Sequence, residues 1–184
     1  MTIDGRRMEA PGWFHPENEA QLERLIAEHG IASAIEIGSF LGASAIWFAR
    51  RVDQVQCVDT WFHSSREETD NNLLFTLRAW DIPHDFFFLF RENVMRSGVW
   101  HKILPVRGDS REVHPYVLPA DLVYIDGDHS HEGCYRDIEL YRLKARKIVC
   151  GDDYVARPGF GVIEAVTQWF PKHEHAGPFW WAML

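Results

Sequence analysis

The chain has 184 residues, of which 46% are hydrophobic and 25% charged, and its formal net charge at pH 7 is −8. These values are typical of one globular domain, and the negative charge disfavours a nucleic-acid partner, which requires a basic face. The three cysteines lie in no CxxC spacing, which indicates reduced thiols in a cytoplasmic protein. The N-terminus lacks a secretory signal pattern, and no apolar stretch approaches the ~20 residues of a membrane span.

Apolar residues alternate between helical and strand-like spacing along most of the chain. Helices are predicted at Pro16–Gly30, Ala43–Arg51, 66–80, 84–96, Glu132–Lys144 and Gly161–Phe170. Strands are predicted at Ser33–Ile37, Val55–Val58, Ile103–Val106, Leu122–Ile125 and Ile148–Cys150, with a closing hairpin at His173–Ala176 and Phe179–Met183. The alternation predicts an α/β fold, a Rossmann-like doubly wound sheet that is mostly parallel with a C-terminal antiparallel hairpin. We expect a single domain over 1–184, with an N-terminal helical segment at 1–30.

Acidic residues stand where the predicted strands end. They are Glu36, Asp59, Asp109, Asp126, Asp152 and Asp153. In an open parallel sheet, ligands bind outside the carboxyl ends of the strands. These side chains therefore predict a rim of carboxylates around a ligand site. Such a rim suits a cofactor rich in hydroxyl and amine groups, or a hard metal cation.

A glycine-containing turn follows the first predicted strand. Gly38 and Gly42 flank it, and glycine lets the backbone pass close to a ligand. Asp59 ends the next strand about 20 residues later, the spacing of a ribose-binding acid in nucleotide folds. Two interpretations remain open here, a dinucleotide fold and an S-adenosylmethionine fold. The spacing lacks the third glycine of G-x-G-x-x-G, which argues against an NAD-dependent oxidoreductase without removing it as the alternative.

Five segments in order resemble the class I S-adenosylmethionine-dependent methyltransferases, especially the small metal-assisted O-methyltransferases of the catechol, caffeoyl-CoA and antibiotic-sugar types. The segments are Ile35–Ser44, Val58–Trp61, Arg107–Ser110, Asp121–Tyr135 and Gly151–Tyr154. The resemblance implies a magnesium-assisted O-methyltransferase that acts on a hydroxyl of a small molecule, such as the sugar or phenol of a natural product. No nucleic acid or membrane partner is expected, and a homodimer is left open. A cofactor-binding protein without metal-assisted catalysis is a second alternative.

The resemblance also implies which residues bind the cofactor. Glu36 and Gly38 would face its amino-acid part, with Ser44 near its carboxylate, and Asp59 would accept hydrogen bonds from the ribose hydroxyls. Asp109 would contact the adenine amine and the Ser110 N–H an adenine ring nitrogen. Further cofactor contacts are expected from Ser39, Gly42, Trp61 and Asp126.

The chain departs from the pattern of the catechol and caffeoyl-CoA enzymes at the metal ligands and at the catalytic base. Asp126, Asp152 and Asp153 would hold a divalent cation, with two aspartates in the last segment as in the sugar enzymes. His129 stands where the catechol enzymes carry a lysine base, and Asp128 is the second candidate for that base. A histidine has an unperturbed pKa of ~6.5, which suits proton removal near neutral pH. The alternative for Asp126 is an ordinary solvated turn after a strand, since Asp-Gly is a common turn pair.

Two further segments, one rich in phenylalanine and one polar, allow predictions about packing and substrate access. Phe86–Phe88 and Phe90 are expected to pack a helix into the core. The polar segment Phe62–Asn72 is as compatible with a lid over the substrate as with an ordinary surface loop.

Overall fold

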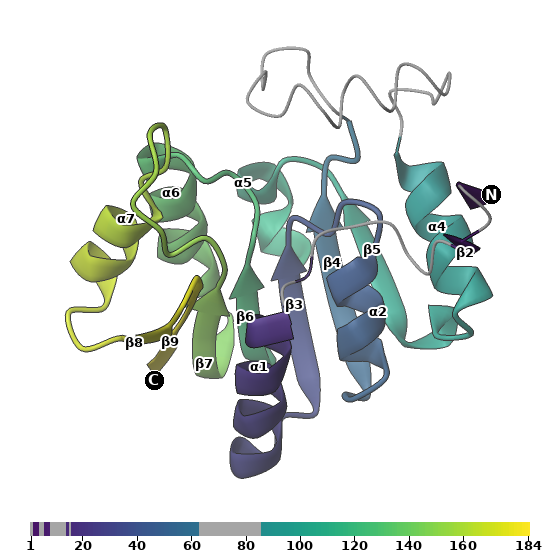
Figure 1. Cartoon of the computed structure of the whole chain (residues 1–184), viewed down its shortest axis with the longest axis horizontal. Coiled ribbons are helices and arrows are strands. Elements are labelled where there is room, and N and C mark those ends of the chain that lie inside the picture. The colour runs from purple at the N-terminus through teal and green to yellow at the C-terminus, as the bar shows by residue number, and fades with distance from the viewer. Residues whose placement is uncertain (1, 4–5, 8–13, 15, 63–85) are drawn as a thin grey trace.

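The computed structural model of the chain describes residues 2–3, 6–7, 14, 16–62 and 86–184. A seven-stranded sheet has the order β5-β4-β3-β6-β7-β9-β8, in which the last two strands run antiparallel to their neighbours (Figure 1). Its strands are β3 (Ser33–Ile37), β4 (Gln54–Asp59), β5 (Ile103–Arg107), β6 (Ala120–Ile125), β7 (Ala145–Gly151), β8 (Glu174–Ala176) and β9 (Phe179–Met183). Two short strands, β1 (Thr2–Ile3) and β2 (Arg6–Arg7), form a separate antiparallel pair. The predicted fold class and all predicted strands are confirmed.

Helices connect the strands. Five of them correspond to predicted helices: α1 (Pro16–His29), α2 (Ala43–Ala49), α4 (Phe87–Arg96), α6 (His131–Tyr141) and α7 (Val162–Trp169). Three short helices were not predicted: η1 (Trp100–Lys102), α5 (Ser110–Val113) and η2 (His114–Tyr116). The predicted helix at 66–80 and all but the first residue of the 62–72 segment lie outside the described residues.

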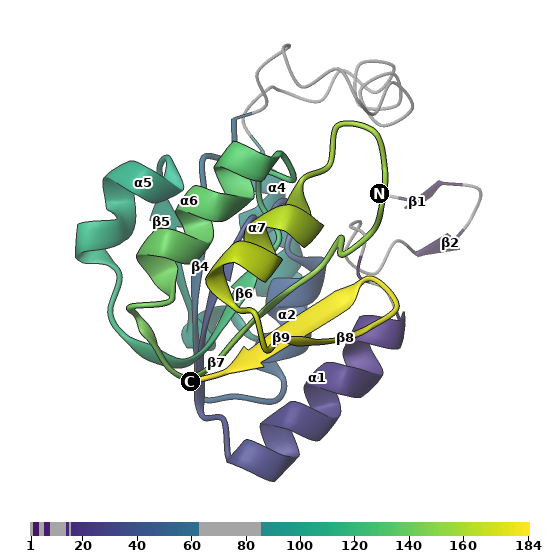
Figure 2. The same cartoon turned by 90° about the vertical axis from the view of Figure 1, so that its left-hand side faces the viewer.

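The helices cover both faces of the sheet (Figure 2). One face carries α1, α2 and α4, which contribute Leu22, Phe48 and Phe90 to the first hydrophobic cluster. The other face carries α6 and α7, which contribute Ile138 and Val166 to the second. Burial of a side chain of this size stabilises a fold by ~1.5–3 kcal/mol, so these two clusters stabilise the sheet from both faces.

The phenylalanine run at the start of α4 is only partly as expected. Phe86 and Phe90 are buried, whereas Phe88 is 58% exposed. Successive helical residues are rotated by about 100°, so three consecutive phenylalanines cannot all face the sheet. The expectation that Phe88 packs into the core is therefore wrong.

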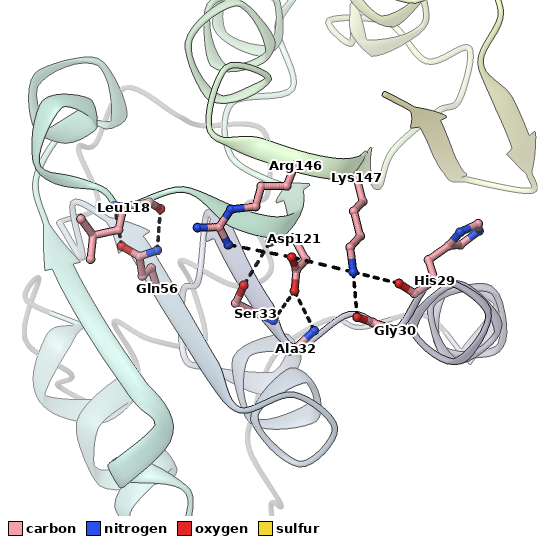
Figure 3. A network of polar contacts seen from close by, with 9 residues as sticks. All are labelled: His29, Gly30, Ala32, Ser33, Gln56, Leu118, Asp121, Arg146 and Lys147. Carbon is pink, nitrogen blue, oxygen red and sulfur yellow. Dashed lines mark hydrogen bonds and ion pairs between the residues drawn. The ribbon is translucent and has the colours of Figure 1, made fainter.

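The amino ends of the strands form a tightly bonded polar network (Figure 3). Asp121, the second residue of β6, accepts hydrogen bonds from the backbone N–H groups of Ala32 at 2.9 Å and Ser33 at 3.3 Å. Arg146 and Lys147 each place a cationic nitrogen 3.9 Å from its carboxylate. This edge ties α1, β3, β6 and β7 together, and no acid of the predicted ligand rim belongs to it.

No helix among the described residues is long and apolar enough to cross a membrane. Cys57, Cys134 and Cys150 are buried and unpaired, as expected for reduced thiols.

Candidate active site

The carboxyl ends of β3 and β6 form the switch point of the sheet, where the strand order reverses. The two strands are parallel neighbours; the glycine turn follows β3, and Asp126 directly follows β6. Gly38 has φ +91°, and a Cβ added to it would lie 2.0 Å from the Asp126 carbonyl oxygen. Glycine is therefore required here, because only its backbone allows the two turns to touch. Open α/β sheets bind ligands at this place.

Glu36 lies beneath the glycine turn with 0% of its surface exposed. Its Oε2 accepts a hydrogen bond from the Ser39 hydroxyl at 2.5 Å, while Oε1 is buried without a hydrogen-bond partner in the described part of the chain. Burial raises the pKa of Glu36 to about 7, and the Ser39 hydrogen bond opposes the rise most. Ser44 and Cys57 oppose it as well, but neither makes a hydrogen bond of standard geometry to Oε1. A buried carboxyl oxygen without a donor indicates a group prepared for a ligand.

The rest of the turn is arranged around this carboxyl. Ser39 and Ser44 are 2% and 5% exposed, and Ser44 is in the first turn of α2. Gly42 caps that helix with φ +93°, and a Cβ on it would approach Phe90 to 3.1 Å. The expected cofactor residues of this segment thus converge on one short turn.

Asp59 is joined to the same turn by backbone hydrogen bonds. Its Oδ2 accepts from the Phe40 N–H at 2.8 Å and its Oδ1 from the Trp61 N–H at 2.6 Å. Burial raises the pKa of Asp59, and these N–H groups oppose the rise. Each carboxylate oxygen has two lone pairs, so both oxygens keep capacity to accept from a ribose hydroxyl.

Trp61 lies in the core rather than in an open position. It is 1% exposed, its indole Nε1–H donates to the Phe40 carbonyl at 2.8 Å, and its ring packs against Phe87 and Phe90 at centroid distances of 5.0 and 4.7 Å. Trp61 could stack on an adenine only by giving up these contacts. Trp61 thus helps to shape the turn, and its contact with the cofactor stays a prediction.

The predicted adenine turn follows β5. Asp109 caps α5 by accepting from the Arg111 N–H at 2.9 Å, and it also forms a two-point ion pair with the Arg111 guanidinium. This pairing lowers the pKa of Asp109, so the side chain is an anion at neutral pH. The Ser110 hydroxyl donates to Asp137 at 2.5 Å, and its carbonyl accepts from the Tyr141 hydroxyl at 2.8 Å. Two residues of α6 therefore hold this turn in place through hydrogen bonds to Ser110.

Three potential metal ligands converge at the end of β6. Asp126, His129 and Asp153 each offer one ligand atom, and these atoms all lie within 4.8 Å of one another. The His129 Nδ1 is 3.3 Å from the Asp153 Oδ2. Asp126 is half-buried as a residue, and burial and then the negative charges of Asp152, Asp153 and Glu36 raise its pKa well above its ordinary value. Uncompensated negative charge of this kind would be relieved by a cation.

Two residues expected at the metal or the base lie differently. Asp152 is close enough to raise the pKa of Asp126, but its Oδ1 accepts from the Asp153 N–H at 2.7 Å and it does not belong to the converging group. Asp128 accepts from the Ser130 N–H at 2.8 Å, and a Cβ on Gly133 would lie 2.2 Å from its carboxyl carbon. Its carboxyl thus faces the first turn of α6.

His129 is held by a second element. Its ring stacks on Phe160 with a centroid distance of 5.0 Å and an interplanar angle of 20°, and the Gly161 N–H donates to its carbonyl at 2.8 Å. Sequence reasoning missed this support from the segment between β7 and α7. It also missed Asp137, because that residue lies in a helix outside any strand-end pattern; a carboxylate on the apolar face of α6 is the signal that could have found it.

An open, mostly parallel sheet with an acidic edge at its switch point defines the α/β class that binds nucleotide-containing cofactors. Residues 35–154 match the family model described as a methyltransferase domain, and this is well over half of the chain. The protein therefore belongs to the methyltransferase-domain family, which decides against the NAD-dependent oxidoreductase alternative. No curated protein matches the chain in sequence.

Solved structures share the fold at low sequence identity. Cofactor-bound Rv0187 from MTB is 17% identical, with 99% of this chain and 92% of that chain covered and a TM-score of 0.68. The O-methyltransferase from Bacillus cereus, in complex with SAH, is 16% identical over 95% and 83%, with a TM-score of 0.65. The O-methyltransferase TomG from Streptomyces achromogenes, involved in tomaymycin synthesis and solved with SAM, is 17% identical over 94% and 81%, with a TM-score of 0.61.

Proposed function

We propose that the protein transfers a methyl group from S-adenosylmethionine to a hydroxyl group of a small molecule. The observation that carries the proposal is the acidic switch point. Among the described residues, no lysine or arginine forms an ion pair with Glu36, Asp59 or Asp126. A cofactor with an ammonium group, a sulfonium and ribose hydroxyls complements that edge, whereas a polyphosphate does not. The SAH and SAM complexes of the B. cereus and S. achromogenes proteins support the same cofactor.

The cofactor assignments follow from the contacts of the turn. Glu36 would accept from the ammonium group with its unpaired Oε1, Asp59 would accept from the ribose, and the first turn of α2 at Ser44 would receive the cofactor carboxylate. Gly38 lets the turn after β3 lie directly against the Asp126 backbone, which sets the shape of the edge that the cofactor would meet. Asp109 and the Ser110 N–H would meet the adenine.

The converging group of Asp126, His129 and Asp153 fits a divalent cation, because two carboxylates and one imidazole supply hard and borderline donors at one point. This set replaces the expected Asp152 by His129. An imidazole ligand makes manganese at least as suitable as magnesium. When a cation is bound, Lewis-acid polarisation of the acceptor hydroxyl becomes available.

The residues of the chain would then position the acceptor hydroxyl and the methyl group relative to each other. Methyl transfer needs the acceptor oxygen in line with the methyl carbon and the sulfonium, and holding both provides much of the acceleration. Phe160 and Asp153 fix the ring of His129 from two sides. Held in this way, a neutral His129 can accept the hydroxyl proton at one ring nitrogen when it is not a metal ligand. The acceptor is proposed to be a sugar or phenol hydroxyl of a natural product, in line with the tomaymycin role of TomG.

Other parts of the proposal concern the whole chain. We propose that residues 1–184 act as one methyltransferase domain, in which α1 (Pro16–His29) contributes Leu22 and Leu25 to the first cluster; the short strands β1 and β2 precede this helix within the segment expected to be helical. The three unpaired cysteines support a cytoplasmic location.

Calorimetric titration with S-adenosylhomocysteine tests the cofactor assignment. We expect micromolar binding by the wild type and at least about tenfold weaker binding by Asp59→Ala, because ribose hydrogen bonds to a charged group are lost. Asp121→Asn, at the opposite end of the sheet, is the matched control and should bind as the wild type. Absence of wild-type binding with and without Mg²⁺ or Mn²⁺ would reject the cofactor.

Manganese titration followed by electron paramagnetic resonance separates the two roles of His129. As a ligand, His129→Ala should weaken Mn²⁺ binding about tenfold or more, and Asp153→Asn should do the same. As a base only, His129→Ala should leave Mn²⁺ binding unchanged and slow turnover by about 10²-fold or more. If the wild type does not bind Mn²⁺, the alternative of a cofactor-binding protein without metal-assisted catalysis would be favoured.

A further inference from the structure

Asp137 is a buried carboxylate with no part in the function proposed so far. It is 4% exposed, and Glu36 is the only other buried acidic residue in the described part of the chain. Burying a carboxylate is costly unless hydrogen bonds compensate for the lost water. Glu36 belongs to the cofactor turn, so the position of Asp137 on α6 requires an explanation of its own.

The contacts of Asp137 lead to two turns that are far apart in the sequence. Its Oδ1 accepts from the Ser110 hydroxyl at 2.5 Å. Its Oδ2 lies 3.3 Å from the point where a Cβ on Gly127 would stand. One oxygen therefore binds the turn after β5, while the other lies near Gly127 without a hydrogen bond among the described residues.

A second residue of α6 reinforces this connection. Tyr141, one helical turn beyond Asp137, donates from its hydroxyl to the Ser110 carbonyl at 2.8 Å. Ser110 is thus held through its side chain and its backbone by the same helix face. The Ser110 N–H remains the group that α6 does not engage, and it is the group assigned to the adenine.

The charge of Asp137 is set by its surroundings. Burial raises its pKa to about 6, Asp128 and Asp109 add to the rise, and Ser110 and Arg111 oppose it. Asp137 is therefore mostly ionised at pH 7 and above. A charged acceptor makes a hydrogen bond roughly twice as strong as a neutral one, which suits a residue that must hold a turn in place.

We propose that Asp137 is a positioning residue that fixes the Ser110 turn against α6 and thereby shapes the adenine end of the cofactor site. This inference rests on the proposed function. Asp137 acts through Ser110 and need not touch the cofactor. Its loss should therefore weaken recognition of the adenine edge more than binding of the rest of the cofactor.

Two ligands that differ only at the base test this role. S-adenosylhomocysteine carries the exocyclic amine and the ring nitrogen that the Ser110 turn would recognise, whereas S-inosylhomocysteine has a carbonyl oxygen and a ring N–H there. We expect Asp137→Ala to weaken S-adenosylhomocysteine binding about tenfold, the effect of one charge-assisted hydrogen bond. S-inosylhomocysteine binding should change less than about twofold, so the wild-type preference for adenine should collapse.

Conservative and coupled variants complete the experiment. Asp137→Asn keeps an acceptor for the Ser110 hydroxyl and should recover most of the adenine preference. Ser110→Ala should resemble Asp137→Ala, and the double variant should be little weaker than either single one, because both act through one contact. Ser110→Ala also serves if Asp137→Ala does not fold.

The outcomes that overturn the proposal are distinct. Equal weakening of both ligands by Asp137→Ala, or additive effects in the double variant, would make Asp137 a purely structural residue. Unchanged S-adenosylhomocysteine binding in Asp137→Ala and Ser110→Ala would reject the inference while leaving the proposed function intact. A wild type that binds neither ligand would overturn the proposed function and this inference with it.

Discussion

The two ends of β6 carry aspartates in opposite circumstances. Burial alone would raise the pKa of Asp121, but two backbone N–H groups and the nearby Lys147 and Arg146 lower it overall. At the other end, burial and three neighbouring carboxylates raise the pKa of Asp126 well above its ordinary value. The same residue type therefore stabilises the fold at one end of the strand, whereas at the other end it faces like charges that only a proton or a cation would relieve. Of these two aspartates, the satisfied one belongs to the frame and the one surrounded by like charges belongs to the candidate ligand site.

The largest effect is expected from a side chain added at Gly38, where the turns after β3 and β6 touch. Gly38→Ala would place a Cβ 2.0 Å from a backbone oxygen of Asp126, so one of the two turns must move. We expect a loss of about 3 kcal/mol or more in the free energy of unfolding and no measurable S-adenosylhomocysteine binding. Urea denaturation and calorimetry measure both quantities.

Gly98→Ala is the matched control for this prediction. Gly98 also has positive φ, +74°, but nothing lies within 4 Å of an added Cβ. The variant should lose only about 1–2 kcal/mol from backbone strain and bind the ligand normally. Equal losses in both variants would show that the close approach of the two turns is unimportant.

A smaller effect of opposite sign is expected from Glu36→Gln. The pKa of Glu36 is raised from its ordinary 4.5 to about 7, so ionisation of this acid destabilises the folded state as the pH rises through that window. At pH 8 the variant should be more stable than the wild type by on the order of 3 kcal/mol, and the two should converge below about pH 4.5. Denaturation at pH 5 and pH 8 tests this, and a difference that does not depend on pH would contradict it.

The smallest effect is expected at the opposite edge. The pKa of Asp121 is lowered on folding, so its charge stabilises the protein above its ordinary pKa of 3.8, and this contribution is lost as the pH falls through the lowered value. Asp121→Asn should cost about 1–2 kcal/mol at pH 7, and less below pH 4. Weakened S-adenosylhomocysteine binding in this variant would break the proposed division between frame and site.

The inner strands β3, β4, β6 and β7 were predictable because each contains a buried apolar run, and the acids at their ends followed from the sheet geometry. The glycine at position 38 was predictable from the turn, although its contact with Asp126 was not. Helix α5 was missed because four residues are too few to show a helical period. Its partner Asp137 was missed because a single acid on a helix carries no spacing pattern.

The metal group illustrates a different reason for a missed contact. Adjacent residues of a strand point to opposite faces, but Asp153 has φ +57°, which takes the chain out of strand geometry directly after β7. That departure brings Asp153 to His129 while Asp152 bonds to the Asp153 N–H. A left-handed aspartate is not readable from sequence, so the partner of His129 could not be chosen among neighbouring acids.

The Asp59 carboxylate binds the Phe40 and Trp61 N–H groups, and the Trp61 indole returns to the Phe40 carbonyl. Phe40 and Trp61 both have positive φ, 43° and 48°, a conformation that non-glycine residues keep only when their surroundings enforce it. The turn after β3 and the turn after β4 thus depend on each other for their conformation, and we expect them to be conserved or replaced together. An exchange of loops with a relative would have to transfer residues 38–42 and 59–61 together, since either segment alone would arrive without the partner that shapes it.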